Sequence, residues 1–492
     1  MTDKQAKRNL ILFPVGTLGR DMIYSLFTNF ILVYVLFTHN LTPAQLMAIT
    51  GIMVGARVFD ALNDPLMGNI IERTRTRWGK YKPWMLIGIL STSVVVYLAF
   101  NVRLQGWPFV WFFGFIYFAY SITYTMHDIS YWGMIPALGS DGAMRDKLTA
   151  LTNLLAGIGG GLAGLFIPML TTGEKAIGGN TQTAYGTVAL IFCILAPLFL
   201  SFTIIGARED RSYMDKPAPP ISFQKIISTI RGNDQLMWMC LIFLIQQIGA
   251  DLIVGGLGST FIYFAFGYRG GLYSLFSTIG LSASAFLLIA YPWLSSKLHR
   301  KKLMRVFGCI AIVGFTTMLV AGLALPRNMT GFWIITAGYM LSQLGMNCFY
   351  VVMMISILNT VEYNEYITGN RDEAIIASIR PFFTKLASAL VVLMISITYL
   401  AFGVTNYTNQ ISTLEQQASM GLITEAAKLS QIDTVIAGVS TGQVRGLLLV
   451  MCIVPFVFTF LSYVLYKKHY DLDEEKYDRI VQELAERKAS EQ

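Results

Sequence analysis

Charged residues are scarce in this sequence of 492 residues. Asp, Glu, Lys and Arg together make up 13% of the chain, whereas hydrophobic residues make up 54%. A soluble domain carries roughly 25% charged residues. The shortage therefore excludes a globule whose whole surface faces water, and it favours a membrane protein.

The alternation of apolar and polar residues that is typical of β-strands is also missing. Long apolar runs take its place, among them 84–101, 185–206, 303–325 and 446–466. About 20 such residues cross the hydrocarbon core as a helix, and only helices or closed barrels satisfy their backbone hydrogen bonds in lipid. Counting the runs predicts an all-α membrane protein with twelve transmembrane helices.

Cysteines are few, and their spacing excludes a disulfide framework or a zinc site. All five lie within apolar segments, where we interpret them as small core residues: Cys193, Cys240, Cys309, Cys348 and Cys452. The sequence also contains no nucleophile–base pair, metal motif or nucleotide-binding loop, so it predicts neither an enzyme nor a resident cofactor. A cleavable signal is missing too, and the first helix is expected to stay in the membrane.

The formal net charge of +8 could suggest a nucleic-acid partner, but its distribution argues for membrane orientation instead. Lys and Arg gather in alternate loops, for example at 73–82 and 297–305. This pattern is typical of loops on the cytoplasmic side. We therefore expect a multi-pass protein of the cytoplasmic (inner) membrane with both termini in the cytoplasm, the lipid bilayer as its surroundings and no nucleic-acid partner.

A polar stretch with several prolines interrupts the middle of the chain and has the composition of a linker. A basic cluster follows the second span of each half, which indicates a parallel two-fold repeat. We expect a monomer with an N-terminal six-helix bundle at 1–206, a cytoplasmic middle loop at 207–234, a C-terminal six-helix bundle at 235–470 and a cytoplasmic tail at 471–492. A second polar stretch, 404–443, predicts at most short helices, and we assign it no role.

Ionisable side chains inside a span cost about 2.5 to 3.5 kcal/mol each on insertion scales, so each one suggests a function. In the second span Asp60, Asn63 and Asp64 share one helical face, and Arg57 lies one turn earlier. Two close carboxylates cannot both stay ionised without a compensating cation, so the spacing predicts a site for Na⁺ or a proton. The alternative is that the acids only form ion pairs with Arg57 and the basic loop.

The fourth span carries Thr125, Asp128 and Trp132 on one face, with Tyr124 beside them. A carboxylate can accept hydrogen bonds from a pair of sugar hydroxyls, and an indole can cover the flat face of a pyranose. The combination of a hydroxyl, a carboxylate and an indole on one face indicates a sugar site, although Trp132 taken alone would favour ordinary packing.

The first span adds Arg20 and Asp21, where Asp21 is expected to bind sugar hydroxyls and Arg20 to balance the charge. The second half of the chain adds Tyr350 and Arg380, together with Lys385. A buried lysine must find a carboxylate or lose its proton. We therefore expect Lys385 to reach one of three acids: Asp60, Asp64 or Asp128.

The seventh span also contains an acid, Asp251, with Gln246 and Gln247 close to it in sequence. Its position suits either the outer gate or the membrane interface. Because the sequence does not decide between these, we leave Asp251 out of the predicted site.

Long strings of residues, in the right order along nearly the whole chain, resemble the glycoside–pentoside–hexuronide cation symporters of the major facilitator superfamily. The strings are Gly19 to Asp21, Arg57 to Gly68, Arg77 to Pro83, Tyr124 to Trp132 and Asn359 to Tyr366. The resemblance implies two six-helix bundles and symport of a sugar with Na⁺ or H⁺ by alternating access. A sodium-coupled lysolipid carrier and a non-transporting sugar sensor remain alternatives.

The resemblance also implies roles for single residues. The cation-site positions are Asp60, Asn63, Asp64 and Thr125, and Lys385 matches a lysine that approaches that site. The sugar-site positions are Asp21, Asp128 and Trp132, with Arg20 in place of a lysine and Tyr350 in place of a tryptophan. Asn153 replaces a sugar-binding arginine, and Arg380-Pro381 replaces a neutral pair, so this shift of positive charge is expected to suit a hexuronide or a sulfonated sugar.

Overall fold

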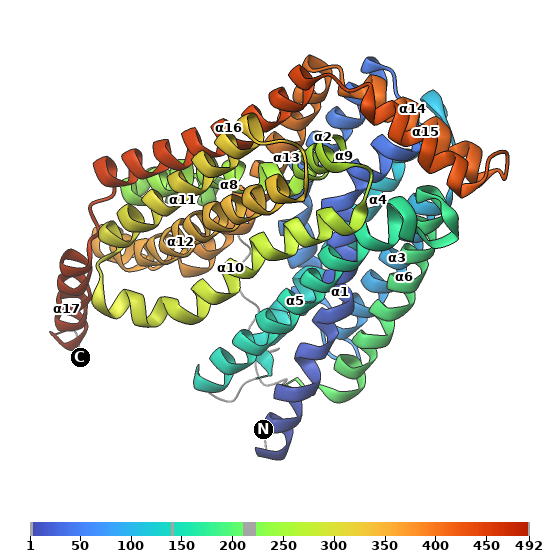
Figure 1. Cartoon of the computed structure of the whole chain (residues 1–492). Helices are drawn as coiled ribbons and strands as arrows, with labels where there is room; N and C mark the ends of the chain where they lie inside the picture. The colour runs from blue at the N-terminus through green and yellow to red at the C-terminus, as the bar shows by residue number, and fades with distance from the viewer. Residues whose placement is uncertain (1–2, 139–141, 210–222, 491–492) are drawn as a thin grey trace. The chain divides into compact units, whose positions relative to one another are not determined.

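The computed structural model describes residues 3–138, 142–209 and 223–490, and within these ranges the regular structure is entirely helical (Figure 1). The long helices of the first half are α1 (Asp3–Thr38), α2 (Pro43–Arg73), α3 (Lys82–Asn101), α4 (Gly106–Met134), α5 (Gly142–Thr171) and α6 (Thr181–Gly206). Those of the second half are α8 (Asp234–Leu252), α10 (Gly270–Lys297), α11 (Arg300–Ala324), α12 (Met329–Thr368), α13 (Glu373–Ala401) and α16 (Thr441–His469).

Shorter helices connect or extend these. They are η1 (Ile135–Ala137), η2 (Gly173–Lys175), η3 (Ile177–Gly179), α7 (Phe223–Gly232), η4 (Ile253–Leu257), α9 (Gly258–Phe266), α14 (Val404–Ser419), α15 (Glu425–Ala437) and α17 (Glu474–Ser490). The middle loop predicted at 207–234 therefore contains α7, while its residues 210–222 lie outside the described part of the chain. The stretch predicted to hold only short helices forms α14 and α15.

Eleven helical segments of the described chain are long and apolar enough to cross a membrane, and the two parts of α2 together make a twelfth. Helices α8 and α9 form one of these segments, Asp234–Phe266, which is continuous through the π-helical turn η4. The prediction of an all-α fold with twelve transmembrane helices is confirmed.

Local sequence explains where several helices begin and end. Thr42 caps α2 and exchanges hydrogen bonds with Gln45, so that two free backbone N–H groups are satisfied at once. Asn180 caps α6 through a hydrogen bond that Thr183 N–H donates. The 40-residue helix α12 ends at Gly369, whose φ of +73° favours glycine.

The chain divides into two compact units that are not simply its two halves. The first consists of Met1–Pro220, Ile262–Leu275 and Tyr399–Ser440, and the second of Ile221–Phe261, Phe276–Thr398 and Thr441–Gln492. Two connecting segments from the second half of the sequence thus belong to the first unit. The domain boundaries expected from the sequence stay predictions.

Helix α14 makes polar contacts with the α1–α2 connection, and α15 contacts the η3 turn through Lys428, which donates to the carbonyl of Gly179. Figure 1 labels both helices. Asn409 donates to the carbonyl of Leu41 and accepts from its N–H, both at 2.9 Å. A fully buried ion pair, Lys428 with Glu415 at 3.2 Å, joins α14 to α15. Glu415 also accepts a 2.7 Å hydrogen bond from the N–H of Thr181 at the start of α6.

Four of the five cysteines are buried, and all five thiols are free. The interpretation of Cys309 as a core residue is wrong, because its side chain is exposed. Cys309 lies within α11, whose exposed positions include the large apolar residues Val306, Ile312 and Val313. Its position on the apolar outer surface of this helix explains why an apolar segment did not imply burial.

Candidate functional site

Arg20 is the centre of a buried charge cluster in the first unit. Its guanidinium holds Asp21 with two parallel hydrogen bonds of 2.9 and 3.0 Å, and it donates a third, 3.1 Å long, to Asp128. The side chain of Arg20 is 5% exposed, while that of Asp128 is 36% exposed. One cation therefore binds two predicted sugar-site acids, and the more exposed acid keeps free surface for a ligand.

Close packing of α1 fixes the position of Arg20. A Cβ atom on Gly19 would lie 2.4 Å from the Cα of Ala196 in α6, so only glycine allows the two backbones to approach this closely. At Gly16 a Cβ atom would meet Thr203 and Tyr131. These contacts hold α1 tightly between α4 and α6 and explain why the residue before Arg20 is glycine.

Aromatic rings border the charge cluster. The guanidinium carbon of Arg20 lies 5.0 Å from the ring centre of Trp132, within the range of a cation–π contact. Tyr124 lies next to Tyr24, with ring centres 5.3 Å apart, and next to Tyr120 at 5.4 Å. Arg20 thus already contacts the indole that the sequence predicts for a pyranose face.

Asp60 lies in a second charge cluster, on the face of α2 predicted to hold a cation. Arg57 approaches its carboxylate to 3.5 Å, and the hydroxyl of Ser121 in α4 donates a hydrogen bond to it. Asp60 is 4% exposed. The sequence did not single out Ser121, although this residue lies one turn before Thr125 on the same face of α4.

Asp64 and Asn63 complete this second cluster. Thr125 donates a 3.1 Å hydrogen bond to Asp64. The side-chain nitrogen of Asn63 is buried and has no partner, so this amide retains unused hydrogen-bonding capacity. Two carboxylates, two hydroxyls and one amide supply the hard oxygen ligands that Na⁺ prefers, and the same carboxylates can take up a proton.

Helix α4 connects the two clusters. Its residues Ser121 and Thr125 contact the acids of α2, and Asp128, one turn further on, contacts Arg20 of α1. These three residues share one helical face because they lie four and three positions apart. One helix, α4, therefore contacts both the α2 acids and the predicted sugar site.

The second unit brings together two of its predicted residues. Arg380 of α13 donates a 3.3 Å hydrogen bond to the hydroxyl of Tyr350 in α12. Lys385 lies on the same helix, partly buried. Its expected approach to an acid of the first half stays a prediction.

The structure does not bring Asn153 into either cluster. Its side chain is exposed on α5 and donates to the carbonyl of Thr149, one turn earlier in the same helix. An asparagine is too short to extend far from the helix axis. Asn153 therefore makes no contact that would replace a sugar-binding arginine in the first unit.

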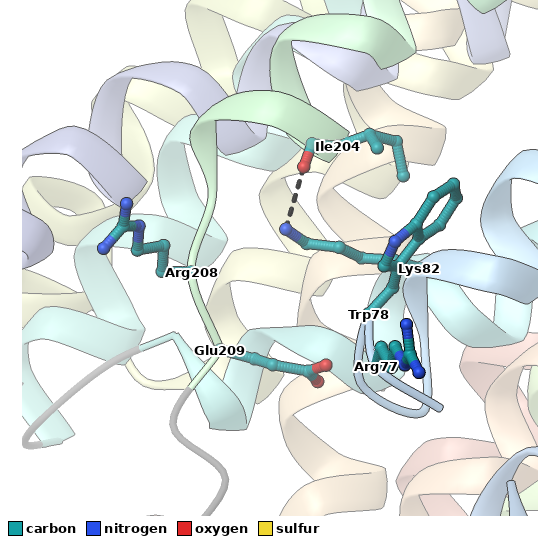
Figure 2. Close-up of a pocket in the computed structure, with 6 residues that line it drawn as sticks. All are labelled: Arg77, Trp78, Lys82, Ile204, Arg208 and Glu209. Atoms are coloured by element: carbon teal, nitrogen blue, oxygen red, sulfur yellow. Dashed lines mark hydrogen bonds between the residues drawn. The ribbon is translucent and has the colours of Figure 1, made fainter. Parts of the chain in front are cut away.

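A cavity of about 470 Å³ lies away from both clusters, beside the α2–α3 connection and the end of α6. Figure 2 shows its lining residues: Arg77, Trp78, Lys82, Ile204, Arg208 and Glu209. Lys82 donates hydrogen bonds to the carbonyls of Ile204 and Ala207, at 2.8 and 2.6 Å. A lysine at this end of a helix satisfies free carbonyl groups, so Lys82 has a structural partner and we assign the cavity no cargo.

Comparisons with known proteins point to transport. The model of the family described as MFS/sugar transport protein matches residues 12–474. Among curated relatives, a lactose permease of Lactobacillus helveticus is 25% identical over 96% of this chain and 71% of its own length. A protein of Escherichia coli strain K12 named glucuronide carrier protein homolog is 23% identical over 100% of this chain and 98% of its own.

The lactose permeases are longer than this chain, which spans only 62 to 71% of their length. Among solved structures, an inward-facing bacterial homologue of the human lysosomal transporter Spinster aligns with a TM-score of 0.63. The identity is 12%, and the alignment covers 95% of this chain and 99% of the other. At this identity the likeness shows the fold alone.

Proposed function

Because the chain belongs to the MFS/sugar transport protein family, we propose that it takes up a sugar or glycoside together with Na⁺ or H⁺. Its relatives include proteins named as a lactose permease, a raffinose carrier and a glucuronide carrier homolog. Transport by alternating access would expose one binding site to each side of the membrane in turn. The chain would act in the cytoplasmic membrane as a monomer, with both termini in the cytoplasm.

The observation that carries this proposal is the shared face of α4. Ser121 and Thr125 bind the paired acids of α2, while Asp128 binds Arg20 beside Trp132. A cation at Asp60 and Asp64 would draw on the two hydroxyls and so shift α4. That shift would position Asp128 for the sugar, and such energetic linkage between two ligands is what coupling requires.

Arg20 sets the resting charge of the sugar site. It neutralises Asp21 through two hydrogen bonds, so the pair carries no net charge. Asp128 then supplies an acceptor that still has exposed surface for sugar hydroxyls. A hydrogen bond to a charged group contributes about 1.5 to 3 kcal/mol, so a sugar can gain affinity here without displacing Arg20.

Accumulation in proteoliposomes tests the function. Purified protein would be supplied with radiolabelled sugars under an imposed Na⁺ gradient or pH gradient, with Asp64→Asn as the variant and Asp433→Asn, an exposed acid on α15, as the matched control. We expect gradient-driven accumulation in the parent and the control, and none in Asp64→Asn. Binding without accumulation in the parent would instead indicate a sensor, and lysolipid in place of sugar would indicate a lipid carrier.

The charge of the sugar is a separate question. Arg380 beside Tyr350 offers a cation and a hydroxyl in the second unit, which favours an anionic sugar such as a hexuronide. Counterflow of a labelled glucuronide and of a neutral galactoside would be compared in the parent and in Arg380→Gln. A preference for the glucuronide that Arg380→Gln loses supports the proposal, and a preference of the parent for the neutral sugar contradicts it.

A further inference from the structure

Asp251 is a partly buried acid of the second unit that the proposed coupling mechanism does not use. It is the 18th residue of the 33-residue span Asp234–Phe266. The helix rises about 1.5 Å per residue, which places Asp251 close to the middle of that span. An ionisable side chain at this depth is costly and suggests a function.

The first span of the chain has an acid at the equivalent place. Asp21 is the 17th residue of the 34-residue span Gln5–Thr38. The two spans open the two halves of the sequence, so Asp251 is the positional counterpart of Asp21. The residue before Asp21 is Arg20, which neutralises it, whereas the residue before Asp251 is Ala250.

Asp251 receives one hydrogen bond, 2.9 Å long, from the side-chain amide of Gln247. Among the described residues of the second unit, no Lys or Arg forms an ion pair with it, and its hydrogen-bond partner is a neutral amide. A carboxylate in a low-dielectric interior is stable only when it is paired or neutral. Asp21 has Arg20 as a paired cation, whereas the described part of the second unit provides none for Asp251.

Two unsatisfied amide oxygens lie next to this acid in the sequence. Those of Gln246 and Gln247 are buried and have no partner, and the two residues are 1% and 9% exposed. The amide nitrogen of Gln246 is anchored to the carbonyl of Met346 in α12. Gln247 thus uses its donor on the carboxylate and leaves its acceptor unused, although a buried acceptor normally finds a donor.

The span is kinked just after Asp251. Residues Ile253–Leu257 form the π-helical turn η4, and Gly256 has a φ of +131°, which side chains other than glycine rarely allow. π-Helical turns inside α-helices occur frequently at functional sites.

Residues of α12, α13 and α16 lie close to the segment around Asp251. Tyr339 of α12 is close enough to feel the charge of Asp251, and its hydroxyl accepts a hydrogen bond from Gln343. Helix α16 contributes Pro455 and Phe458 near Gly249, and α13 contributes apolar side chains near Gly255. The described side chains next to Gly249 and Gly255 are therefore apolar.

We propose that Asp251 is a proton-binding site in the middle of the second unit, which takes a proton from water and returns it during each transport cycle. Na⁺ is the less suitable ligand, because it needs several oxygen ligands and Gln247 presents its nitrogen. A proton needs only one carboxylate oxygen. Once protonated, Asp251 can donate to the unused oxygen of Gln247 after the amide turns over, which satisfies both groups.

Infrared difference spectroscopy between acid and alkaline pH tests the site on the purified full-length protein without any sugar. We expect the carbonyl stretch of a protonated, buried carboxylic acid in the parent. This signal should be lost in Asp251→Asn, return in Asp251→Glu and persist in the control Asp433→Asn. A signal that Asp251→Asn leaves unchanged would overturn the proposal.

Gln247→Leu provides a second variant that keeps the acid. It removes the donor that stabilises the ionised carboxylate, so the midpoint of the infrared titration should move to higher pH. A midpoint that stays in place or moves lower would contradict the assignment, even if Asp251→Asn does not fold. Because neither measurement uses a sugar, both stand if the proposed sugar transport fails.

Sugar counterflow then tests the role in transport, and this step rests on the proposed function. The exchange rate should change with pH by up to about tenfold per pH unit for one linked proton. In Asp251→Asn that dependence should disappear, and in Asp251→Glu it should return. If Asp251→Asn keeps the pH dependence and only raises the sugar concentration required, Asp251 binds sugar hydroxyls and the proton assignment is wrong.

Discussion

The two units treat the acid in the middle of their first span in opposite ways. Asp21 forms two hydrogen bonds with Arg20, and the adjoining acid Asp128 shares the same guanidinium. Asp251 has a neutral amide as its hydrogen-bond partner and an alanine in the place of the arginine. A permanent cation gives a site of constant charge, whereas an acid without one can change its charge when a proton binds.

This difference separates two tasks that a coupled transporter must perform. The neutral Arg20–Asp21 pair can hold a polar cargo in every state of the cycle, because its charge does not depend on the coupling ion. The α2 acids Asp60 and Asp64 lie between these two cases in how tightly a cation pairs with them. Arg57 is 3.5 Å from Asp60, and each acid accepts a hydrogen bond from a hydroxyl of α4. Charge exchange is therefore expected at the acids without a tight arginine partner.

The largest expected effect comes from removing the permanent cation. Arg20→Ala leaves the largely buried Asp21 without a counter-charge and removes a partner of the more exposed Asp128. Removing one partner of a buried ion pair costs about 3 to 5 kcal/mol. We expect loss of sugar counterflow and a clear drop in the thermal unfolding temperature of the purified protein.

Arg20→Lys is the matched control for this change. It keeps the positive charge but cannot form two parallel hydrogen bonds while also reaching a second acid. Its stability should lie between those of the parent and Arg20→Ala, with counterflow partly retained. Equal stability of parent and Arg20→Ala would show that the cluster is not a balanced ion network.

The next largest effect is expected from placing an arginine directly before Asp251, as Arg20 stands before Asp21. In Ala250→Arg the new guanidinium would precede the acid directly, as in the first span, and position 250 is only partly buried. A permanent cation should keep Asp251 ionised at all accessible pH values. Counterflow should then lose its pH dependence while Ala250→Gln, of similar size but neutral, keeps it.

Much of the fold could be predicted because lipid imposes a strong and simple constraint. Runs of about 20 apolar residues are long enough to count directly in the sequence, and the count of twelve agrees with the helices observed. The apolar runs do not show how the segments that connect the transmembrane helices pack. The grouping of α14 and α15 with the first-half helices depends on contacts such as Asn409 with Leu41, 368 positions apart, which no local pattern shows.

In the candidate site, too, local spacing predicts which residues share a helix face but not the contacts between distant residues. The helical spacing of Thr125, Asp128 and Trp132 predicts one shared face of α4, and the same spacing would have found Ser121. The bond from Arg20 to Asp128 joins residues 108 positions apart and could not be inferred from spacing. Asp251 was left undecided because the break at Gly256 lies inside an unbroken apolar run and leaves no polar signal in the sequence.

A smaller effect is expected from the hydroxyl that spacing missed. Ser121→Ala removes a hydrogen bond that stabilises the ionised form of Asp60, and such bonds to charged groups contribute about 1.5 to 3 kcal/mol. The hydroxyl is also placed to act as a cation ligand, so the apparent affinity for Na⁺ in driven uptake should fall by about tenfold or more. Ser130→Ala is the control on α4, since its hydroxyl bonds to the Met126 carbonyl instead.

The ion pair of α14 and α15 extends the comparison to a buried acid outside the spans, and its effect should be the smallest and most local. Burial raises the pKa of Glu415 above its ordinary value, and Lys428 only partly offsets this. The folded helices therefore bind this proton more tightly than the unfolded chain does. Their stability is then greatest below the ordinary pKa and falls as the pH rises through the folded pKa.

Limited proteolysis of the purified protein at the turn between α14 and α15, where Met420 and Leu422 are exposed, measures this directly. Cleavage should be slower at acid pH than at neutral pH in the parent, after correction for the protease's own pH profile. Glu415→Gln cannot ionise, and it should remove the dependence, whereas Asp433→Asn on the exposed side of α15 should keep it. Faster cleavage of the parent at acid pH would mean that the ion pair with Lys428 outweighs burial, and that a resident cation stabilises a buried acid here as Arg20 does in the first span.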